Sequence, residues 1–140
     1  MHQVAAPTDR PPAGRLEARI FQSLTVSAVR RLVWRRAAEA GFAPARRHDL
    51  VLAVSEVATN SVRHADGRGV IRVWQEGEDL ISEVADRGRP DEPLVARSLP
   101  APEEEGGYGL WIARRLCDRV EALSNEAGTV IRLYMRPTAG

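Results

Sequence analysis

Ala45-Arg-Arg-His-Asp-Leu-Val-Leu-Ala-Val-Ser-Glu-Val-Ala-Thr-Asn-Ser-Val-Arg-His64 is the stretch that decides the fold. Its apolar residues recur at helical spacing and Pro44 stands directly before it, so it predicts an amphipathic helix from about residue 45 to 64. One stripe beside the apolar face carries polar side chains, at Asp49, Glu56, Asn60 and His64. The helix therefore places a carboxylate and a carboxamide one turn apart on a largely buried element.

The segments on either side predict two more helices and five strands. Thr25 or Ser27 can cap a helix that runs to about Ala40 and is closed by Gly41. The arginines of this helix lie mostly outside its apolar face; they are Arg30, Arg31, Arg35 and Arg36. Helical periodicity returns at 110–118, and strand-like segments lie at 16–24, 70–75, 80–85, 120–123 and 129–135. Consecutive hairpins favour antiparallel neighbours, and the helices need an apolar surface to cover. The expected fold is α+β, a two-layer α/β sandwich whose mainly antiparallel sheet carries its helices on one face.

The composition predicts one domain. A chain of 140 residues with 44% apolar residues can fill a single core. Residues 1–14 are rich in Pro, Ala and Arg and predict a disordered arm, which leaves the domain at 15–137. The formal net charge of +1 lacks the basic excess of a dedicated nucleic-acid binder, so direct binding to nucleic acid is not expected.

The single cysteine and the absence of long apolar runs also restrict the possibilities. Cys117 excludes an internal disulfide, and it falls in a helical pattern with Leu110 and Ala113 that predicts a buried structural thiol. The sequence has no signal-peptide core and no run approaching the about 20 apolar residues of a membrane span. A cytoplasmic location without a membrane partner is expected.

All twenty basic residues are arginine. Lysine-dependent chemistry is therefore excluded, including a P-loop lysine, a Schiff base and a catalytic kinase lysine. Any contact to phosphate must come from arginine, a backbone N–H, a helix N-terminus or a metal.

The stripe on the long helix suits one kind of chemistry. The amide oxygen of Asn60 is a neutral oxygen ligand of the type that Mg²⁺ accepts beside phosphates and waters. The carboxylate of Glu56, one turn earlier, is near enough to orient or deprotonate a hydroxyl that attacks phosphorus. Taken alone, this spacing is more typical of a solvated helix face.

Two further motifs change that interpretation. Asp86-Arg-Gly-Arg-Pro90 follows a predicted strand directly, so the carboxylate projects where the strand ends and Gly88 lets a ligand approach the backbone. Gly106-Gly-Tyr-Gly-Leu110 opens the last helix and supplies free N–H groups to a phosphate. By themselves, the first motif is more typical of a turn and the second is equally typical of a flexible entry to a helix. The segment 87–107 between them has no regular period and predicts a mobile lid.

Together the three motifs resemble the asparagine box and the two glycine boxes of the ATPase superfamily that includes gyrase and the histidine kinases. Val54–Ala65 and Gly107–Val120 are similar, more narrowly, to the anti-sigma-factor serine kinases of the RsbW type in their actinobacterial form. The resemblance covers about residues 16–136, and it implies a Bergerat-type ATP-binding fold with ATP and Mg²⁺ as cofactors.

The resemblance also implies a role for each matching residue. Glu56 is expected to be the general base toward a serine hydroxyl, Asn60 the Mg²⁺ ligand, and Asp86 the acceptor for the adenine amine. The remaining nucleotide contacts are expected from Gly88, Gly107, Gly109, Leu110 and Thr129. His64 either contacts phosphate or caps the C-terminus of its helix. Some relatives carry a lysine before the threonine that Thr129 matches, where this chain has Ala127-Gly128. The candidate residues to neutralise the γ-phosphate in place of that lysine are Arg87, Arg89 and Arg97.

The implied partners are a sigma factor and a small antagonist protein whose serine is phosphorylated, together with a possible homodimer. Arginines on the first helix and the group Trp111, Arg114 and Arg115 are candidate docking surfaces, although a solvated arginine face is the commoner case. Two alternatives stay open: a noncatalytic ATP-binding module that clamps a partner, and a sensor-kinase fragment, which the absence of a dimerisation helix disfavours.

Overall fold

The computed structural model describes residues 15–64, 67–87 and 108–138. Within them, β1 (Glu17–Gln22) leads through a 3-10 turn, η1 (Ser23–Thr25), into α1 (Val26–Glu39) and α2 (Pro44–His64). The hairpin of β2 (Arg68–Glu76) and β3 (Asp79–Asp86) follows, and α4 (Tyr108–Leu116) then precedes the hairpin of β4 (Arg119–Asn125) and β5 (Gly128–Met135).

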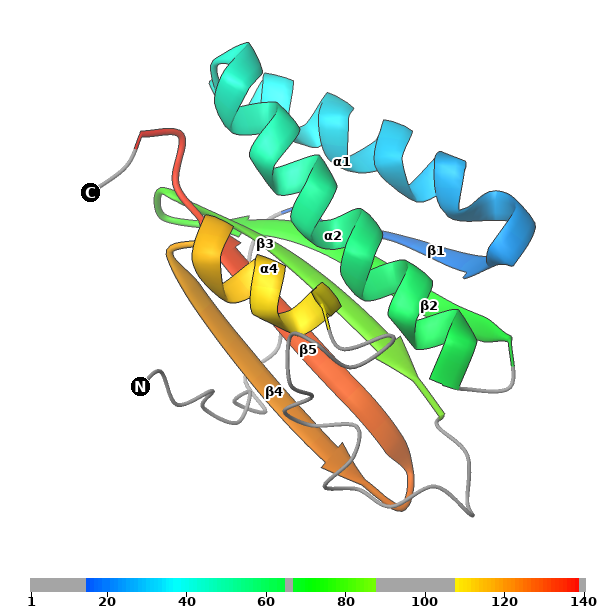
Figure 1. Cartoon of the computed structure of the whole chain (residues 1–140). Helices are drawn as coiled ribbons and strands as arrows, with labels where there is room; N and C mark the ends of the chain where they lie inside the picture. Colours follow the sequence, from blue (N-terminus) through cyan, green and yellow to red (C-terminus); the bar gives the residue numbers. More distant parts are fainter. Residues whose placement is uncertain (1–14, 65–66, 88–107, 139–140) are drawn as a thin grey trace.

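The five strands form one antiparallel sheet in the order β1-β2-β3-β5-β4. Helices α1, α2 and α4 all lie on the same side of it (Figure 1). The predicted α+β sandwich, with a mainly antiparallel sheet and helices on one face, is confirmed. None of the described helices is both long enough and apolar enough to span a bilayer.

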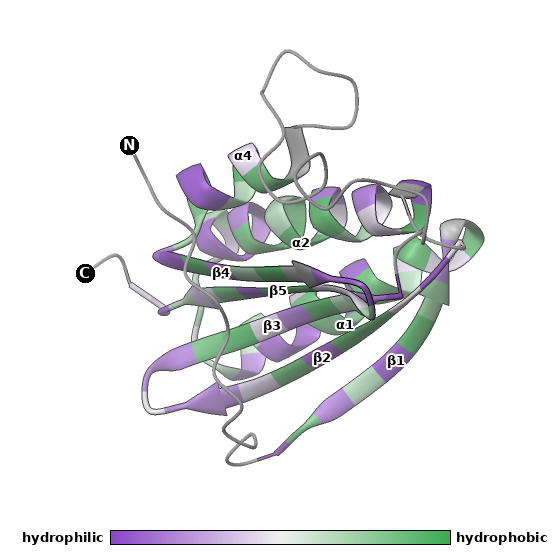
Figure 2. Ribbon diagram, turned by 90° about the horizontal axis from the view of Figure 1, so that it is seen from below, coloured by the Kyte–Doolittle hydropathy of each residue, from purple (hydrophilic) through white to green (hydrophobic). Residues whose placement is uncertain are grey.

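The main core lies between the sheet and α2. Leu50, Val54 and Val57 on α2 are at most 2% exposed, and they pack with strand residues such as Val84 and Leu133 in one buried cluster. Side chains alternate along each strand, so every second residue faces this cluster and the others face away from the helices. Figure 2 shows this alternation of hydrophobic and hydrophilic residues along the strands. The long helix predicted from the sequence is therefore the centre of the fold.

Two local expectations were wrong. Arg36 was expected outside the apolar face of the first helix, but it is 6% exposed and donates hydrogen bonds to Glu17 Oε1 at 3.1 Å and to the carbonyl oxygen of Val73 at 3.2 Å. Its guanidinium is buried because it joins α1 to β1 and β2. The first strand ends at Gln22 instead of Leu24, because the hydroxyl of Thr25 accepts a hydrogen bond from the N–H of Gln22 and closes η1 without capping α1.

Candidate functional site

Helix α2 carries the two residues on which the expected chemistry depends. Glu56 and Asn60 are both partly buried and lie one helical turn apart. The amide oxygen Oδ1 of Asn60 is buried, and no residue in the described part of the chain forms a hydrogen bond with it. An unsatisfied buried acceptor costs about 1–3 kcal/mol, so it is rare without a functional reason. This oxygen is available to a metal ion or a donor that enters the site.

The strand end beside Asn60 carries the predicted adenine-binding carboxylate. Asp86 is the last residue of β3 and lies opposite Thr129 of β5, whose side chain is buried. The hydroxyl of Ser61 donates a hydrogen bond to Asp86 Oδ2 over 2.6 Å. Because Ser61 directly follows Asn60, this bond fixes the end of β3 against the part of α2 that bears the unsatisfied amide. The structure thus brings Asn60, Asp86 and Thr129 together, as expected.

Ser61 is a residue of this site that was not predicted from the sequence. It is 6% exposed and lies among the buried apolar residues of α2, one turn after Val57. A short polar residue on an otherwise apolar helix face must find a partner, because a buried hydroxyl without one is costly. That signal was present in the sequence, although it does not identify Asp86 as the partner.

Gly128 permits the close approach of β5 to β3. Its φ is +140°, and a Cβ atom placed there would lie 1.8 Å from the carbonyl oxygen of Asp86. Such a distance is far below van der Waals contact, so only glycine fits without displacing the backbone. Gly128 therefore sets Thr129 directly opposite Asp86, and of these two neighbours only Thr129 was predicted to belong to the site.

Helix α4 contributes the third predicted element in part. It starts at Tyr108, two residues before the predicted start, and Leu110 in its first turn is 3% exposed. The first N–H groups of a helix have no partner within it, and the N–H of Gly109 is one of them. Gly88, Gly107 and the predicted lid beyond Arg87 lie outside the described residues, as do the arm 1–14 and the side chain of His64.

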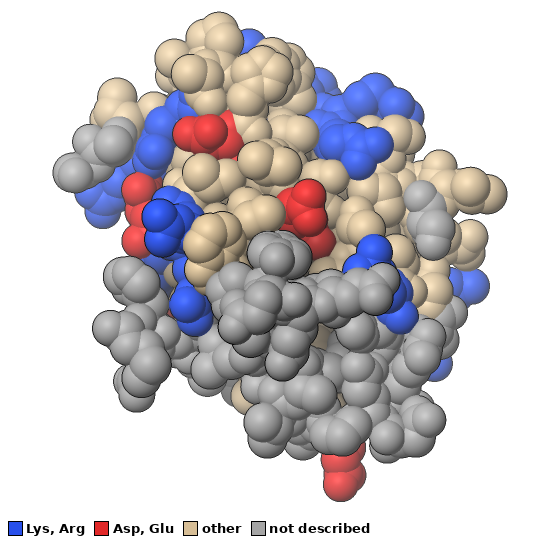
Figure 3. All heavy atoms as spheres, in the orientation of Figure 1, with Lys and Arg blue, Asp and Glu red and all other residues tan. Residues whose placement is uncertain are grey.

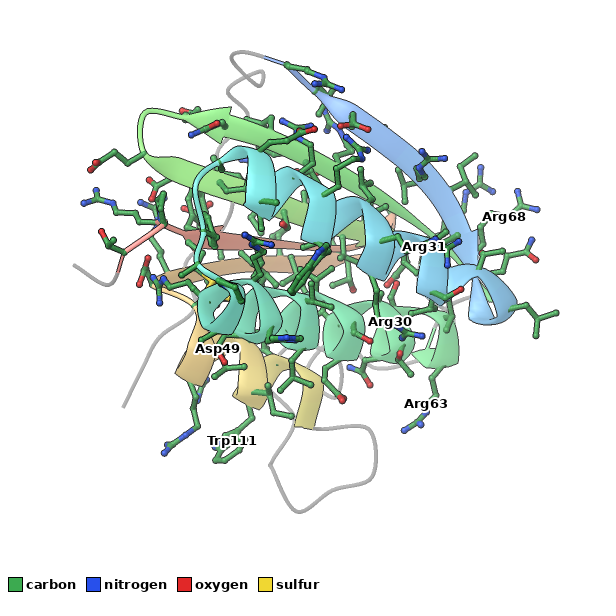
Figure 4. The ribbon with its side chains drawn as sticks, turned by 90° about the horizontal axis from the view of Figure 1, so that it is seen from above. Arg30, Arg31, Asp49, Arg63, Arg68 and Trp111 are labelled. Carbon is green, nitrogen blue, oxygen red and sulfur yellow. The ribbon has the colours of Figure 1, made fainter. Side chains whose placement is uncertain are left out.

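Arginines surround this end of the molecule. Figure 4 shows Arg30, Arg31, Arg63 and Arg68 toward one end, whereas Asp49 and Trp111 lie toward the other. Arg87 directly follows Asp86 and is exposed. The positive charges favour an anionic ligand near the end of α2. Cys117 takes no part, because its burial raises the pKa of the thiol to about 12, as expected for a structural residue.

Comparisons with known proteins agree with this geometry. Residues 22–135 match the profile of the family described as histidine kinase-like ATPase domain. The chain is 31% identical over 112 residues to the serine-protein kinase RsbW of Bacillus pumilus (strain SAFR-032), an alignment that covers 67% of this chain and 68% of that protein.

Two solved structures share the fold. The RsbU and RsbW domains of a Mycobacterium tuberculosis protein match with a TM-score of 0.62 and 22% identity, over 86% of this chain and 32% of that one, so this chain spans about a third of its length. The catalytic domain of the histidine kinase ThkA matches with a TM-score of 0.54 and 15% identity, over 87% of this chain and 97% of that one. The resemblance seen in the motifs is confirmed: the chain belongs to the histidine kinase-like ATPase domain family and is of the RsbW type.

Proposed function

We propose that this chain is an anti-sigma factor and protein serine kinase that binds Mg-ATP, phosphorylates a serine of an antagonist protein and regulates transcription through a sigma factor. The observation that carries this proposal is the buried, unsatisfied Oδ1 of Asn60, one turn after Glu56 and adjacent to the Ser61–Asp86 hydrogen bond. The sequence similarity to the serine-protein kinase RsbW supports the same activity.

The residues present fit Mg-ATP. Asn60 would hold Mg²⁺ through its unsatisfied amide oxygen, which is the hard, neutral ligand that this ion accepts. The carboxylate of Asp86 would accept a hydrogen bond from the adenine amine, with Thr129 beside it on the neighbouring strand. Arg87, which follows Asp86 and is exposed, is a candidate to neutralise phosphate charge in a chain without lysine.

Glu56 would act on the substrate side. When bound, Mg-ATP supplies an electrophilic phosphoryl group and the charge that stabilises its transfer. The carboxylate of Glu56 would accept the proton of the attacking serine hydroxyl, a contribution typically worth about 10²–10⁴ in rate. Its position one turn from Asn60 supports this role, because the base and the phosphoryl group must lie on the same side of α2.

The partner proteins would dock near the site on basic surface. Figure 3 shows basic side chains gathered over α1, where Arg30 and Arg31 are exposed. Arg115 stacks over the ring of Trp111 at 4.9 Å on α4 and forms a second candidate surface. Aromatic and arginine side chains are the residues that most often dominate the energy of protein interfaces.

The test of kinase activity compares Glu56→Gln with Asp49→Asn, a matched control that removes a carboxylate near the other end of α2 (Figure 4). Each purified variant is incubated with Mg-ATP and the candidate antagonist proteins of its own organism, and phosphoserine and nucleotide affinity are measured. We expect Glu56→Gln to bind Mg-ATP normally and to lose at least about a hundredfold in transfer rate, while Asp49→Asn keeps both.

Two results would contradict the kinase assignment. Transfer by Glu56→Gln at the wild-type rate would remove Glu56 as the base. Binding of Mg-ATP by the wild type without phosphoserine on any candidate would favour the noncatalytic partner-binding module.

A further inference from the structure

A row of apolar side chains crosses the helix-free face of the sheet. The strand register sets Ile20 opposite Val70, Val70 opposite Ala85, Ala85 opposite Val130, and Val130 opposite Leu123. Residues adjacent to these in the chain, such as Phe21, Ile71 and Val84, are buried on the helix side, so the alternation of a strand directs the row to the other face. We call these five residues, which span all five strands, the apolar stripe.

The apolar stripe is accessible. Ile20 is 67% exposed and Leu123 43% exposed at its two ends, and the three residues between them are partly exposed. A cavity of about 400 Å³ hollows the face at Ile20, Val70 and Ala85. Single exposed apolar residues are normal on a protein surface, but a continuous exposed row marks an interaction site.

One side of the stripe is bordered by charges that already satisfy one another. Glu83 accepts hydrogen bonds from Arg72 at 3.1 Å and from Arg132 at 2.7 Å. Glu121 is likewise bonded to Arg119 and to the hydroxyl of Tyr134. Both carboxylates are 3% exposed, so this row of ion pairs offers no unpaired acid to a partner.

The other side of the stripe is basic. Arg68 and Arg87 line the same cavity, are exposed and form no ion pair with another residue of the described chain. Arg68 has the same parity along β2 as Val70, which directs its side chain to the helix-free face, and Arg87 directly follows the last residue of β3. An apolar strip with a positive border is complementary to an apolar strip with a negative border.

The dimensions of the stripe match a short helix. Four steps between neighbouring strands, at about 4.8 Å each, make it about 19 Å long. A helix rises 1.5 Å per residue and covers that length with about 13 residues. We propose that the apolar stripe binds an acidic amphipathic helix of a partner protein, which lies across the strands and directs its carboxylates at Arg68 and Arg87.

A second copy of the chain is a poorer occupant. In a face-to-face pair whose twofold axis runs along the stripe, Arg68 and Arg87 meet the row of ion pairs around Glu83 and Glu121, whose carboxylates are already bonded. With the axis across the stripe, the basic border meets the same border of the partner, which offers the exposed Glu126 of the β4–β5 turn against two arginines of each copy. Both arrangements leave positive charge uncompensated, which is costly at an interface.

The stripe adjoins the proposed nucleotide site, because Asp86 lines the same cavity as Arg68 and Arg87, whereas Asn60 and Ser61 lie on α2. Arg87 is a candidate contact for both ligands. Ile20 and Arg68 take no part in the proposed nucleotide contacts, so their variants test the stripe by itself.

The test uses two synthetic helical peptides of about 14 residues, with leucines on one face and either glutamates or lysines beside them. Binding to the full chain is followed by fluorescence anisotropy, and the contact surface by amide chemical shifts. We expect the glutamate peptide to bind at the stripe, and Ile20→Glu and Arg68→Glu each to weaken it at least about tenfold. The matched control is Leu52→Glu, which alters a 46% exposed leucine on α2 and should leave the affinity unchanged.

Several outcomes would overturn the proposal. One is failure of the glutamate peptide to bind, and another is binding of the lysine peptide with the same affinity. A third is that the amide chemical shift changes are confined to the helix side of the sheet. A dimer seen by sedimentation that Ile20→Glu dissociates would show instead that a second copy covers the stripe. A dimer that survives Ile20→Glu uses another surface and is compatible with the helix.

Discussion

Ser61→Ala tests whether the hydrogen bond between α2 and β3 prepares the adenine site. The substitution removes a buried donor that lies 2.6 Å from Asp86 Oδ2 and changes little else, because alanine favours the helix. A hydrogen bond to a charged acceptor contributes about 1.5–3 kcal/mol, so we expect the free energy of unfolding to fall by about that amount. If half of this cost appears in the alignment of Asp86 with a nucleotide, ATP binding weakens about three- to twelvefold.

The assay is calorimetric titration with Mg-ATP and with Mg-ITP, whose base carries a carbonyl oxygen in place of the adenine amine. If Asp86 accepts the adenine amine, Ser61→Ala should weaken ATP more than ITP and so reduce the preference for ATP. Ser55→Ala is the control, since Ser55 lies on the same helix and its hydroxyl accepts a hydrogen bond from the exposed Arg30, away from Asp86. Equal affinities for Ser61→Ala and Ser55→Ala, with the ATP preference intact, would refute the reasoning.

Three further predictions concern the fold around the site. Hydrogen bonds from Arg35, aided by its charge and by Arg36, hold the pKa of Glu17 at about 2 against the opposing effect of burial. The free energy of unfolding should therefore fall as the pH drops from about 4.5 toward 2. Urea titrations at a series of pH values should show a weaker pH dependence for Glu17→Gln than for the wild type. Gly128→Ala should lower the free energy of unfolding by more than about 2 kcal/mol in chemical denaturation and weaken the binding of Mg-ATP, because its Cβ would meet the backbone of Asp86. The control Gly77→Ala, whose Cβ would have no atom within 4 Å, should cost only about 1 kcal/mol. Equal losses of stability for the two variants would contradict this account. The thiol of Cys117, protonated at neutral pH and 8% exposed, should react with a thiol reagent only on unfolding, and rapid labelling of the native chain would disprove its burial.

The sequence predicted those features that repeat with a period. The apolar spacing of α2 and the two hairpins determined the antiparallel sheet with helices on one face, because each element must bury its apolar side. The position of Glu56 and Asn60 on one side of α2 followed from the geometry of a helix alone. Asp86 and Thr129, 43 residues apart, could be paired only through the family resemblance, which placed both at the adenine.

The features that the sequence did not predict depend on contacts between distant elements. Arg36 is a long charged residue, and periodicity cannot show that β1 and β2 provide Glu17 and a carbonyl oxygen to bury it. In β1 the apolar Ile20 faces solvent while Phe21 is buried, since the adjacent Gly69 leaves room for the ring of Phe21. Gly128 is required by the approach of two backbones, which no local pattern reports.

The central claim is that Asn60 holds the metal of a bound Mg-ATP. Titration calorimetry of the full chain with Mg-ATP tests it most directly, using the wild type, Asn60→Ala and the neighbouring control Thr59→Ala. We predict that the wild type and Thr59→Ala bind with similar affinity, and that Asn60→Ala binds at least about tenfold more weakly, because one ligand to the metal is lost. Absence of binding by the wild type, or unchanged binding by Asn60→Ala, would contradict the account.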